Sequence, residues 1–231
     1  MRIFRFSVFI ALLFIIACKD EPKQEPEAPE DSTDSLVVES VDTVLSADAI
    51  QTFSTSGIAD YARKKSPSFD WARFRMVSTY EEDSLLASAF TPEKDFYKNY
   101  GPFLKYSPDS SHFIDLDSYN IDITRDAQGR LTGAEIGPDT EIGLVDLTGK
   151  TRSRLLFMGP GGNVEDGLWL DNSTVVLMGT QENQQGERVP TIWRYHIPTK
   201  TFFVYELPDP SMAGSLADYW KTERLKGVAI K

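Results

Sequence analysis

The runs VEDGLWL (164–170), STVVLMGT (173–180), VPTIWRYHI (189–197) and FFVYEL (202–207) decide the fold of this 231-residue chain. Each run is short and rich in β-branched and aromatic residues, which is typical of strands. The separators are turn-forming residues: Asp171-Asn172, a polar loop from Gln181 to Glu187, and Pro198-Thr199-Lys200. Pro208 and Pro210 end the series, because proline cannot donate to a sheet. The pattern predicts four antiparallel strands joined by hairpins.

A similar series precedes this one. The pattern predicts a strand on either side of the turn Ser107-Pro108-Asp109-Ser110, over Phe103 to Tyr106 and over Phe113 to Leu116. It also predicts an additional hairpin over residues 119–138 that turns at Asp126 to Gly129. Two further strands, Glu141 to Leu147 and Arg152 to Met158, flank Thr148-Gly149-Lys150. The sequence therefore predicts a second unit of four strands over 103–158, beside the unit over 159–208.

The two units repeat each other loosely at their turns. Tyr106-Ser107-Pro108-Asp109 corresponds to Leu170-Asp171-Asn172, and Leu147-Thr148-Gly149-Lys150 corresponds to Ile197-Pro198-Thr199-Lys200. Each unit resembles a β-propeller blade with a Ser-Pro-Asp-Gly inner turn, although Ser110 replaces the glycine. Because propellers close with roughly four to eight blades, two cannot form a ring, and their open edges require another cover. We expect a mainly β fold of propeller-like units; an α+β domain with an antiparallel sheet is the alternative.

The flanking segments predict helices at both ends of the folded part. In the lead-in over 49–102, Ser46 or Asp48 caps a weak helix that ends at Pro67, a strand spans 72–80, and a short helix spans 81–89. Thr91-Pro92-Glu93 then has the composition of another helix start. After the β units, apolar residues at near-helical spacing predict a helix over 211–226 that packs over the sheets.

The N-terminus has the features of an export signal. Arg2 and Arg5 precede a nearly continuous apolar run that is too short for a bilayer span of roughly 20 residues, and the chain's single cysteine follows in Ile15-Ile16-Ala17-Cys18. This tetrad resembles the lipobox of bacterial lipoproteins. The resemblance implies that residues 1–17 are cleaved and that Cys18 becomes the lipid-modified first residue, carrying several acyl chains that include palmitate. A plain secretory signal is the alternative.

The composition predicts a tether over residues 18–48, followed by one folded domain over 49–231. Residues 19–48 hold two lysines against ten carboxylates and few aliphatic residues, so they cannot bury enough surface to fold alone. Removal of Arg2 and Arg5 with the signal changes the formal charge from −11 to −13. This acidic balance argues against nucleic acid as a partner.

Short motifs within the tether suggest a location and a modification. Cys18-Lys19-Asp20-Glu21 resembles an export signal that directs lipoproteins to the outer face of the outer membrane; an acidic linker is the alternative. The triplets that contain Ser32, Ser35 and Thr43 resemble bacterial O-glycosylation sites, as does Asp83-Ser84-Leu85 in the domain. Chance occurrence in a segment rich in Asp, Ser and Thr is the competing explanation.

The residues that commonly carry catalysis are sparse. The chain has only two histidines, and its one cysteine is expected to carry lipid, which argues against a zinc site. The glycine-containing loops around 143–151 and 159–162 lie between predicted strands, whereas a nucleotide-binding loop precedes a helix. Asp115 and Asp117, with Asn120 and Asp122 nearby, could form an acid/base pair or bind calcium. We interpret them as an exposed strand face, because the glycine and glutamate of a calcium loop are missing. We therefore predict no metal and no cofactor.

Aromatic residues offer the remaining binding candidates. Trp193 and Tyr195 alternate on one strand, and Trp169 precedes them on another; together they could stack against sugars or a protein, or pack within the core. The sequence predicts a non-enzymatic, lipid-anchored binding or assembly module of the cell envelope, whose partners are the membrane and an envelope protein or glycan. It leaves the periplasmic and external faces open. The alternative is a carbohydrate-active hydrolase, which requires paired carboxylates in a cleft flanked by Trp169 or Trp193.

Overall fold

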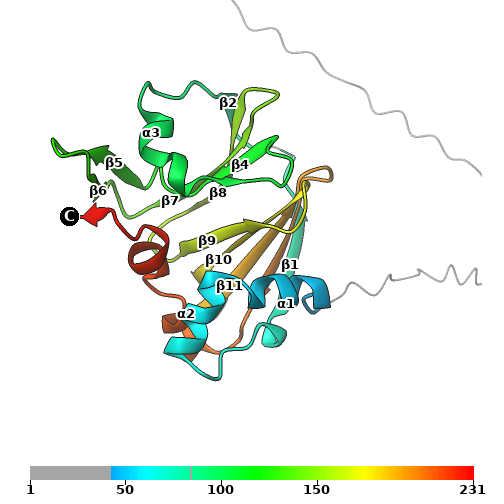
Figure 1. Ribbon diagram of the computed structural model, residues 1–231. Helices are drawn as coiled ribbons and strands as arrows, with labels where there is room; N and C mark the ends of the chain where they lie inside the picture. Colours follow the sequence, from blue (N-terminus) through cyan, green and yellow to red (C-terminus); the bar gives the residue numbers. More distant parts are fainter. Residues whose placement is uncertain (1–42, 84) are drawn as a thin grey trace, which may run out of the picture. The chain divides into compact units, whose positions relative to one another are not determined.

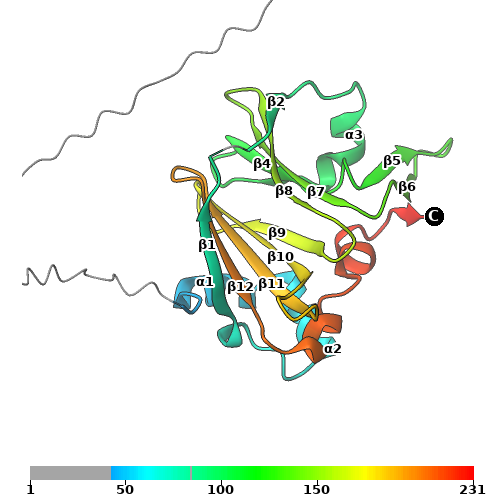
Figure 2. The same cartoon turned by 180° about the vertical axis from the view of Figure 1, so that it is seen from behind.

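All four strands expected over 164–207 are present in the computed structural model, which describes residues 43–83 and 85–231. Together with β1 at the edge, they form sheet A, an antiparallel sheet in the order β1-β12-β11-β10-β9 (Figure 2). The strands are β1 (Arg75–Glu81), β9 (Asn163–Trp169), β10 (Thr174–Glu182), β11 (Arg188–His196) and β12 (Thr201–Glu206). The hairpin order and the turns between β9 and β12 are as predicted.

The first predicted unit forms sheet B, with strand order β2-β8-β7-β4-β3. Its members are β2 (Ala87–Ala89), β3 (Lys105–Tyr106), β4 (His112–Asp115), β7 (Thr140–Asp146) and β8 (Thr151–Met158). The additional hairpin is also confirmed: β5 (Ile121–Arg125) pairs with β6 (Leu131–Glu135), and the short parallel strand β13 (Ala229–Ile230) joins β6. These three strands form sheet C.

Strand alternation places one core between sheets A and B. On β10, Val175 and Leu177 point toward sheet B, where they join a cluster that contains Ile114, Ile142 and Leu155. The neighbouring β10 residues Val176 and Met178 point the other way. This period of two is what a sheet buried on both faces requires.

Helices cover the outer faces of both sheets (Figure 1). On sheet A, α1 (Ala47–Ser54), α2 (Gly57–Lys65) and the 3₁₀ turn Trp71–Arg73 supply buried residues such as Phe53 and Ile58. The predicted cap Ser46 accepts a hydrogen bond from Ala49 N–H. On sheet B, α3 (Phe96–Tyr100) packs Phe96 and Tyr100 near Phe113. A 3₁₀ turn, Gly101–Phe103, follows α3.

Equivalent turns of the two sheets share detailed geometry. In each inner turn an aspartate accepts bonds from the N–H and hydroxyl of the serine two residues later: Asp109 from Ser111, and Asp171 from Ser173. Asn172 also accepts a bond from Asp109 N–H, at 3.0 Å, so the two turns touch. At the other turns, Lys150 and Lys200 share a left-handed backbone, with φ of 53° and 52°. The loose repeat in the sequence therefore corresponds to repeated local structure.

Two predicted helices are wrong. Residues 87–89 form β2, because their backbone pairs with β8, and the predicted helix over 81–89 is absent from the described residues there. The segment over 211–226 is a 3₁₀ helix (Pro210–Ser215) and a π-helical turn (Trp220–Arg224), not a continuous α-helix. Asp218 has a φ of 68°, which interrupts a regular helix between them.

The terminal segment nevertheless packs on the sheets, as expected. Leu216 and Tyr219 are buried with α1, α2 and the outer face of sheet A, whereas Leu225 and Val228 are buried against the β5–β6 hairpin. The fold class is thus mainly β, with antiparallel sheets and flanking helices. Sheets A and B have five strands each and pack face to face through one core.

Candidate functional site

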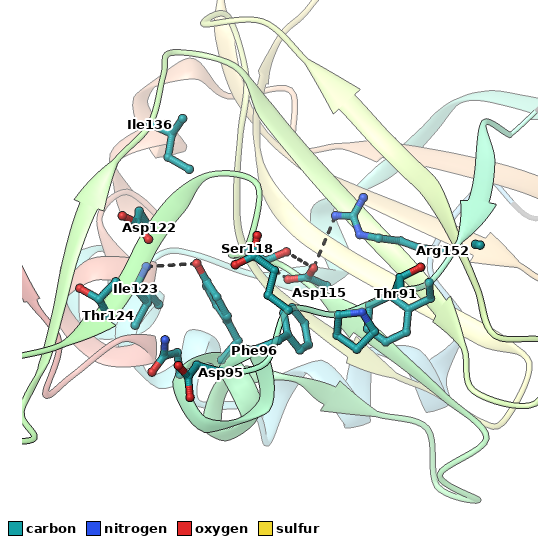
Figure 3. Close-up of a pocket in the computed structure, with 16 residues that line it drawn as sticks. Thr91, Asp95, Phe96, Asp115, Ser118, Asp122, Ile123, Thr124, Ile136 and Arg152 are labelled. Carbon is teal, nitrogen blue, oxygen red and sulfur yellow. Dashed lines mark hydrogen bonds and ion pairs between the residues drawn. The ribbon is translucent and has the colours of Figure 1, made fainter.

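The candidate site is a pocket of about 580 Å³ beside sheet B (Figure 3). One wall is α3 with the chain that leads into it, including Thr91, Glu93 and Phe96. The opposite wall is the β5 region, where Asp122 and Ile123 lie. Pockets that combine aromatic rings with a few polar groups are the usual small-ligand sites of proteins.

Tyr100 connects the two walls of this pocket. Its hydroxyl donates to the Ile121 carbonyl at 2.9 Å and accepts from the Ile123 N–H at 3.1 Å, so α3 is held to β5 at two points. Burial raises the pKa of Tyr100, and the charge of Asp122 adds to this effect. The phenol therefore stays protonated at neutral pH and fixes the spacing of the walls.

Asp115 forms part of the pocket floor and is almost fully buried, with 1% of its surface exposed. Its carboxylate accepts bonds from Asp117 N–H at 3.2 Å, from Ser118 N–H at 3.0 Å and from the Ser118 hydroxyl, and it pairs with Arg152 at 3.5 Å. The interpretation of Asp115 and Asp117 as an exposed strand face is wrong. Both are buried, and Asp117 is only 2% exposed.

The cations that neutralise this region lie on β8. Arg152 binds both Asp115 and Glu141, and Arg154 holds the other Glu141 oxygen at 2.6 Å. Gly143 makes room for this arrangement, since a Cβ there would lie 2.7 Å from the Arg152 guanidinium. The buried charges of the floor are therefore matched by cations and hydrogen bonds, as burial requires.

Asp117 faces a second set of partners on the opposite side of the same segment. Its Oδ2 atom accepts from Arg224 Nη1 at 2.6 Å, and both side chains are at least 95% buried. Arg224 also donates through Nε to the Glu165 carbonyl at 2.9 Å. Burial raises the pKa of Asp117, while the charge of Arg224 opposes that increase.

Glu165, on β9, is a further buried carboxyl whose ionisation is changed by burial. Burial raises its pKa to about 7, although the N–H groups of Trp220 and Asp218 and the charge of Arg224 favour the ionised form. Trp220 N–H donates to Glu165 Oε2 at 3.0 Å, which ties the terminal segment to β9. The pKa of Glu165 therefore depends on how the terminal segment packs against β9.

Three carboxylates of the first pocket differ from these buried groups. Glu93, Asp95 and Asp122 line it, are exposed to solvent, and have no hydrogen-bond donor or cation as a side-chain partner among the described residues. With Asp115 and Arg152, the lining holds four carboxylates and one guanidinium, a formal charge of −3. The pocket therefore presents unused acceptors and a negative potential.

The predicted aromatic binding surface is wrong for two of its three members. Trp193 and Tyr195 are 2% and 3% exposed and belong to the core between sheets A and B. Trp169 is half-buried, donates its indole N–H to the Lys105 carbonyl at 2.8 Å, and lines a separate shallow pocket that Tyr106 also lines. The competing interpretation, core packing, is therefore correct for Trp193 and Tyr195.

The predicted modification sites lie mostly outside the structure. Cys18, Ser32 and Ser35 fall outside the described residues. Thr43 is the first described residue; it is exposed, and its carbonyl accepts a bond from Met76 N–H. The last part of the predicted tether also belongs to the fold, because Leu45 is buried and α1 begins at Ala47.

No group of three or more potential metal ligands is found within residues 43–83 and 85–231. In the same part of the chain, no helix has both the length and the apolar character needed to cross a bilayer. Comparisons with protein-family models, with curated proteins and with solved structures find no match.

Sequence reasoning missed the first pocket because its walls meet only in the folded chain. The helix expected at Thr91-Pro92-Glu93 is present as α3, although it begins later, at Phe96. Nothing in the local pattern of α3 indicates that Tyr100 bonds to β5, more than 20 residues away. The clustering of Asp122 with other polar residues was the one signal that marked this region.

Proposed function

We propose that this protein is a non-enzymatic binding module of the cell envelope, held at a membrane by lipid on Cys18, and that its first pocket receives a cationic group of an envelope partner. The observation that carries the proposal is the contrast within the pocket lining. The buried carboxylates of the floor are paired with cations, whereas the side chains of Glu93, Asp95 and Asp122 have no partner among the described residues. Unused acceptors at the rim of a preformed pocket are suited to binding a donor.

A catalytic role has less support from the same geometry. A carboxylate that acts as acid or base must exchange its proton with a substrate. Asp115 instead accepts three hydrogen bonds and an ion pair from its own chain. The hydrolase hypothesis also requires Trp169 or Trp193 beside the carboxylates, but Trp169 lines a different pocket and Trp193 lies in the core.

The binding proposal is tested with the full-length mature protein and two probes, tetralysine and tetraglutamine. We expect calorimetry to show binding of tetralysine that weakens as salt increases, because the rim carboxylates are exposed. Glu93→Gln combined with Asp122→Asn should lower the affinity about tenfold, which corresponds to about 1.4 kcal/mol.

The matched control removes the same charge elsewhere: Glu182→Gln combined with Glu187→Gln, both exposed and outside this pocket. Equal affinities of the two double variants would show that net charge alone attracts the peptide. That result would refute the assignment of the pocket.

The anchor is tested separately with Cys18→Ser. If lipid holds the protein, the variant should leave the detergent phase and accumulate as an uncleaved precursor. Unchanged detergent partitioning would contradict the lipoprotein proposal, without bearing on the pocket.

A further inference from the structure

A second pocket, of about 430 Å³, lies on the other side of the segment that contains Asp115 and Asp117. Its walls come from three places: the loop after β6, including Pro138; the loop before β9, including Pro160; and the terminal segment around Trp220. Asp117 lines this second pocket, and Asp115 lines the first. The two pockets therefore share a wall and have separate linings.

One buried polar atom of this pocket has no partner. Asp117 Oδ2 is bound by Arg224, but Oδ1 has no hydrogen-bond donor among the described residues. An acceptor buried in this way is costly unless a donor reaches it. The Asp117 side chain thus adds an acceptor with incomplete hydrogen bonding to the wall of the pocket.

An aromatic ring and further polar groups line the same pocket. Trp220 is half-buried there, and its indole N–H has no acceptor among the described residues. The exposed Lys221 ammonium lies 5.8 Å from the centre of the ring and forms a long ion pair of 3.5 Å with Glu135. Arg188, at the rim, uses one nitrogen on the Pro160 carbonyl and retains other donors.

The charge of the lining favours a neutral ligand. Four carboxylates and three cations line the second pocket, a formal charge of −1, whereas the first pocket carries −3. A cationic ligand would meet Arg188, Lys221 and Arg224, and an anionic one would meet the four carboxylates. A neutral molecule with many hydroxyl groups avoids both costs, because hydroxyls donate and accept.

We propose that the second pocket binds a neutral saccharide, with a sugar ring against Trp220 and hydroxyls that bond to Arg188 and the other polar groups of the lining. Aromatic faces supply apolar area at low entropic cost, and the polar groups around the ring then select hydroxyl positions. This site is independent of the cation-binding role proposed for the first pocket.

The test titrates the full-length mature protein with chitotetraose, cellotetraose and maltotetraose, using calorimetry and tryptophan fluorescence. We expect saturable binding of at least one sugar. Trp220→Ala should weaken that binding at least tenfold, and Arg188→Ala should weaken it less. Trp169→Ala is the matched control, because Trp169 is also half-buried and lines a different pocket; its affinity should be unchanged.

Asp117→Asn is not used, because it leaves Arg224 buried without its anion. Each variant is compared with the wild type by its melting temperature. If Trp220→Ala fails to fold, Arg188→Ala, whose side chain is exposed, decides the question. Absence of saturable binding by the folded wild type would overturn the proposal. So would wild-type affinity in Trp220→Ala, wild-type affinity in Arg188→Ala, or a loss in Trp169→Ala alone.

Discussion

Replacement of Glu165 by glutamine should make the protein more stable at alkaline pH and remove part of its pH dependence. The carboxyl has a pKa of 4.5 in an ordinary environment and about 7 in the folded protein, mainly because of burial. A group whose folded-state pKa is raised gives its full stability below the unfolded pKa and loses it as pH rises through the folded pKa. The window here is therefore from about pH 4.5 to about pH 7.

The size of the effect follows from the same two values. Each pKa unit of difference is worth about 1.4 kcal/mol, so ionisation of Glu165 costs the folded state about 3 kcal/mol across that window. Glutamine keeps an oxygen that can accept from Trp220 N–H, which removes the titration and preserves this bond. Glu165→Gln should thus equal the wild type near pH 4.5 and exceed its free energy of unfolding by up to about 3 kcal/mol at pH 8.

Urea denaturation at intervals from pH 4.5 to pH 8 measures this difference. Glu223→Gln is the control, since Glu223 is exposed in the same terminal segment; its difference from the wild type should vary little with pH. Arg224, Asp117 and Asp166 lie in the same charge network and are present in both proteins. If the difference in free energy of unfolding between Glu165→Gln and the wild type stays constant with pH, the reasoning is refuted.

Three further predictions concern stability. Arg224→Met should lower the free energy of unfolding by about 3–5 kcal/mol in the same urea assay, because it leaves Asp117 buried without a cation. Lys221→Met, at an exposed ion pair, should lower it by less than about 1 kcal/mol. Gly179→Ala should lower the melting temperature, since its Cβ would lie 1.9 Å from a backbone oxygen, whereas Gly214→Ala, with open space around it, should leave that temperature unchanged. Deletion of residues 211–231 should increase binding of a hydrophobic dye, because it exposes the core residues that pack against Leu216, Tyr219 and Leu225. If the truncated protein keeps its melting temperature and stays monomeric, the segment is an appendage.

The β units could be predicted because their signals are local. Alternation of apolar residues defines each strand, and turn residues such as Pro198 to Lys200 define where it ends. Both signals act within one hairpin, and the repeated hairpins are present in the structure. The failures occur where tertiary contacts decide. Residues 87–89 are extended because β8 offers them a free edge, and the terminal apolar residues divide between two different clusters.

Buried charge was the main feature that strand alternation could not reveal. Residues i and i+2 share a face only while a strand continues, and this rule placed Asp115 and Asp117 together. β4 ends at Asp115, however, and the chain turns as the Asp115 carboxylate accepts bonds from the N–H groups of Asp117 and Ser118. The two carboxylates consequently point to different pockets and pair with arginines from β8 and the terminal segment.

This turn also explains why the two pockets differ in charge although they share a wall. Arg152 reaches the first pocket from a neighbouring strand and divides its charge between two buried carboxylates, so it cannot balance the rim. Arg224 reaches the second pocket through a segment that also brings Lys221, and both cations lie among its carboxylates. The negative first pocket and the nearly neutral second pocket therefore follow from the cations supplied to each: Arg152 alone in the first, and Arg188, Lys221 and Arg224 in the second. It is this difference that leads us to expect separate ligands for them.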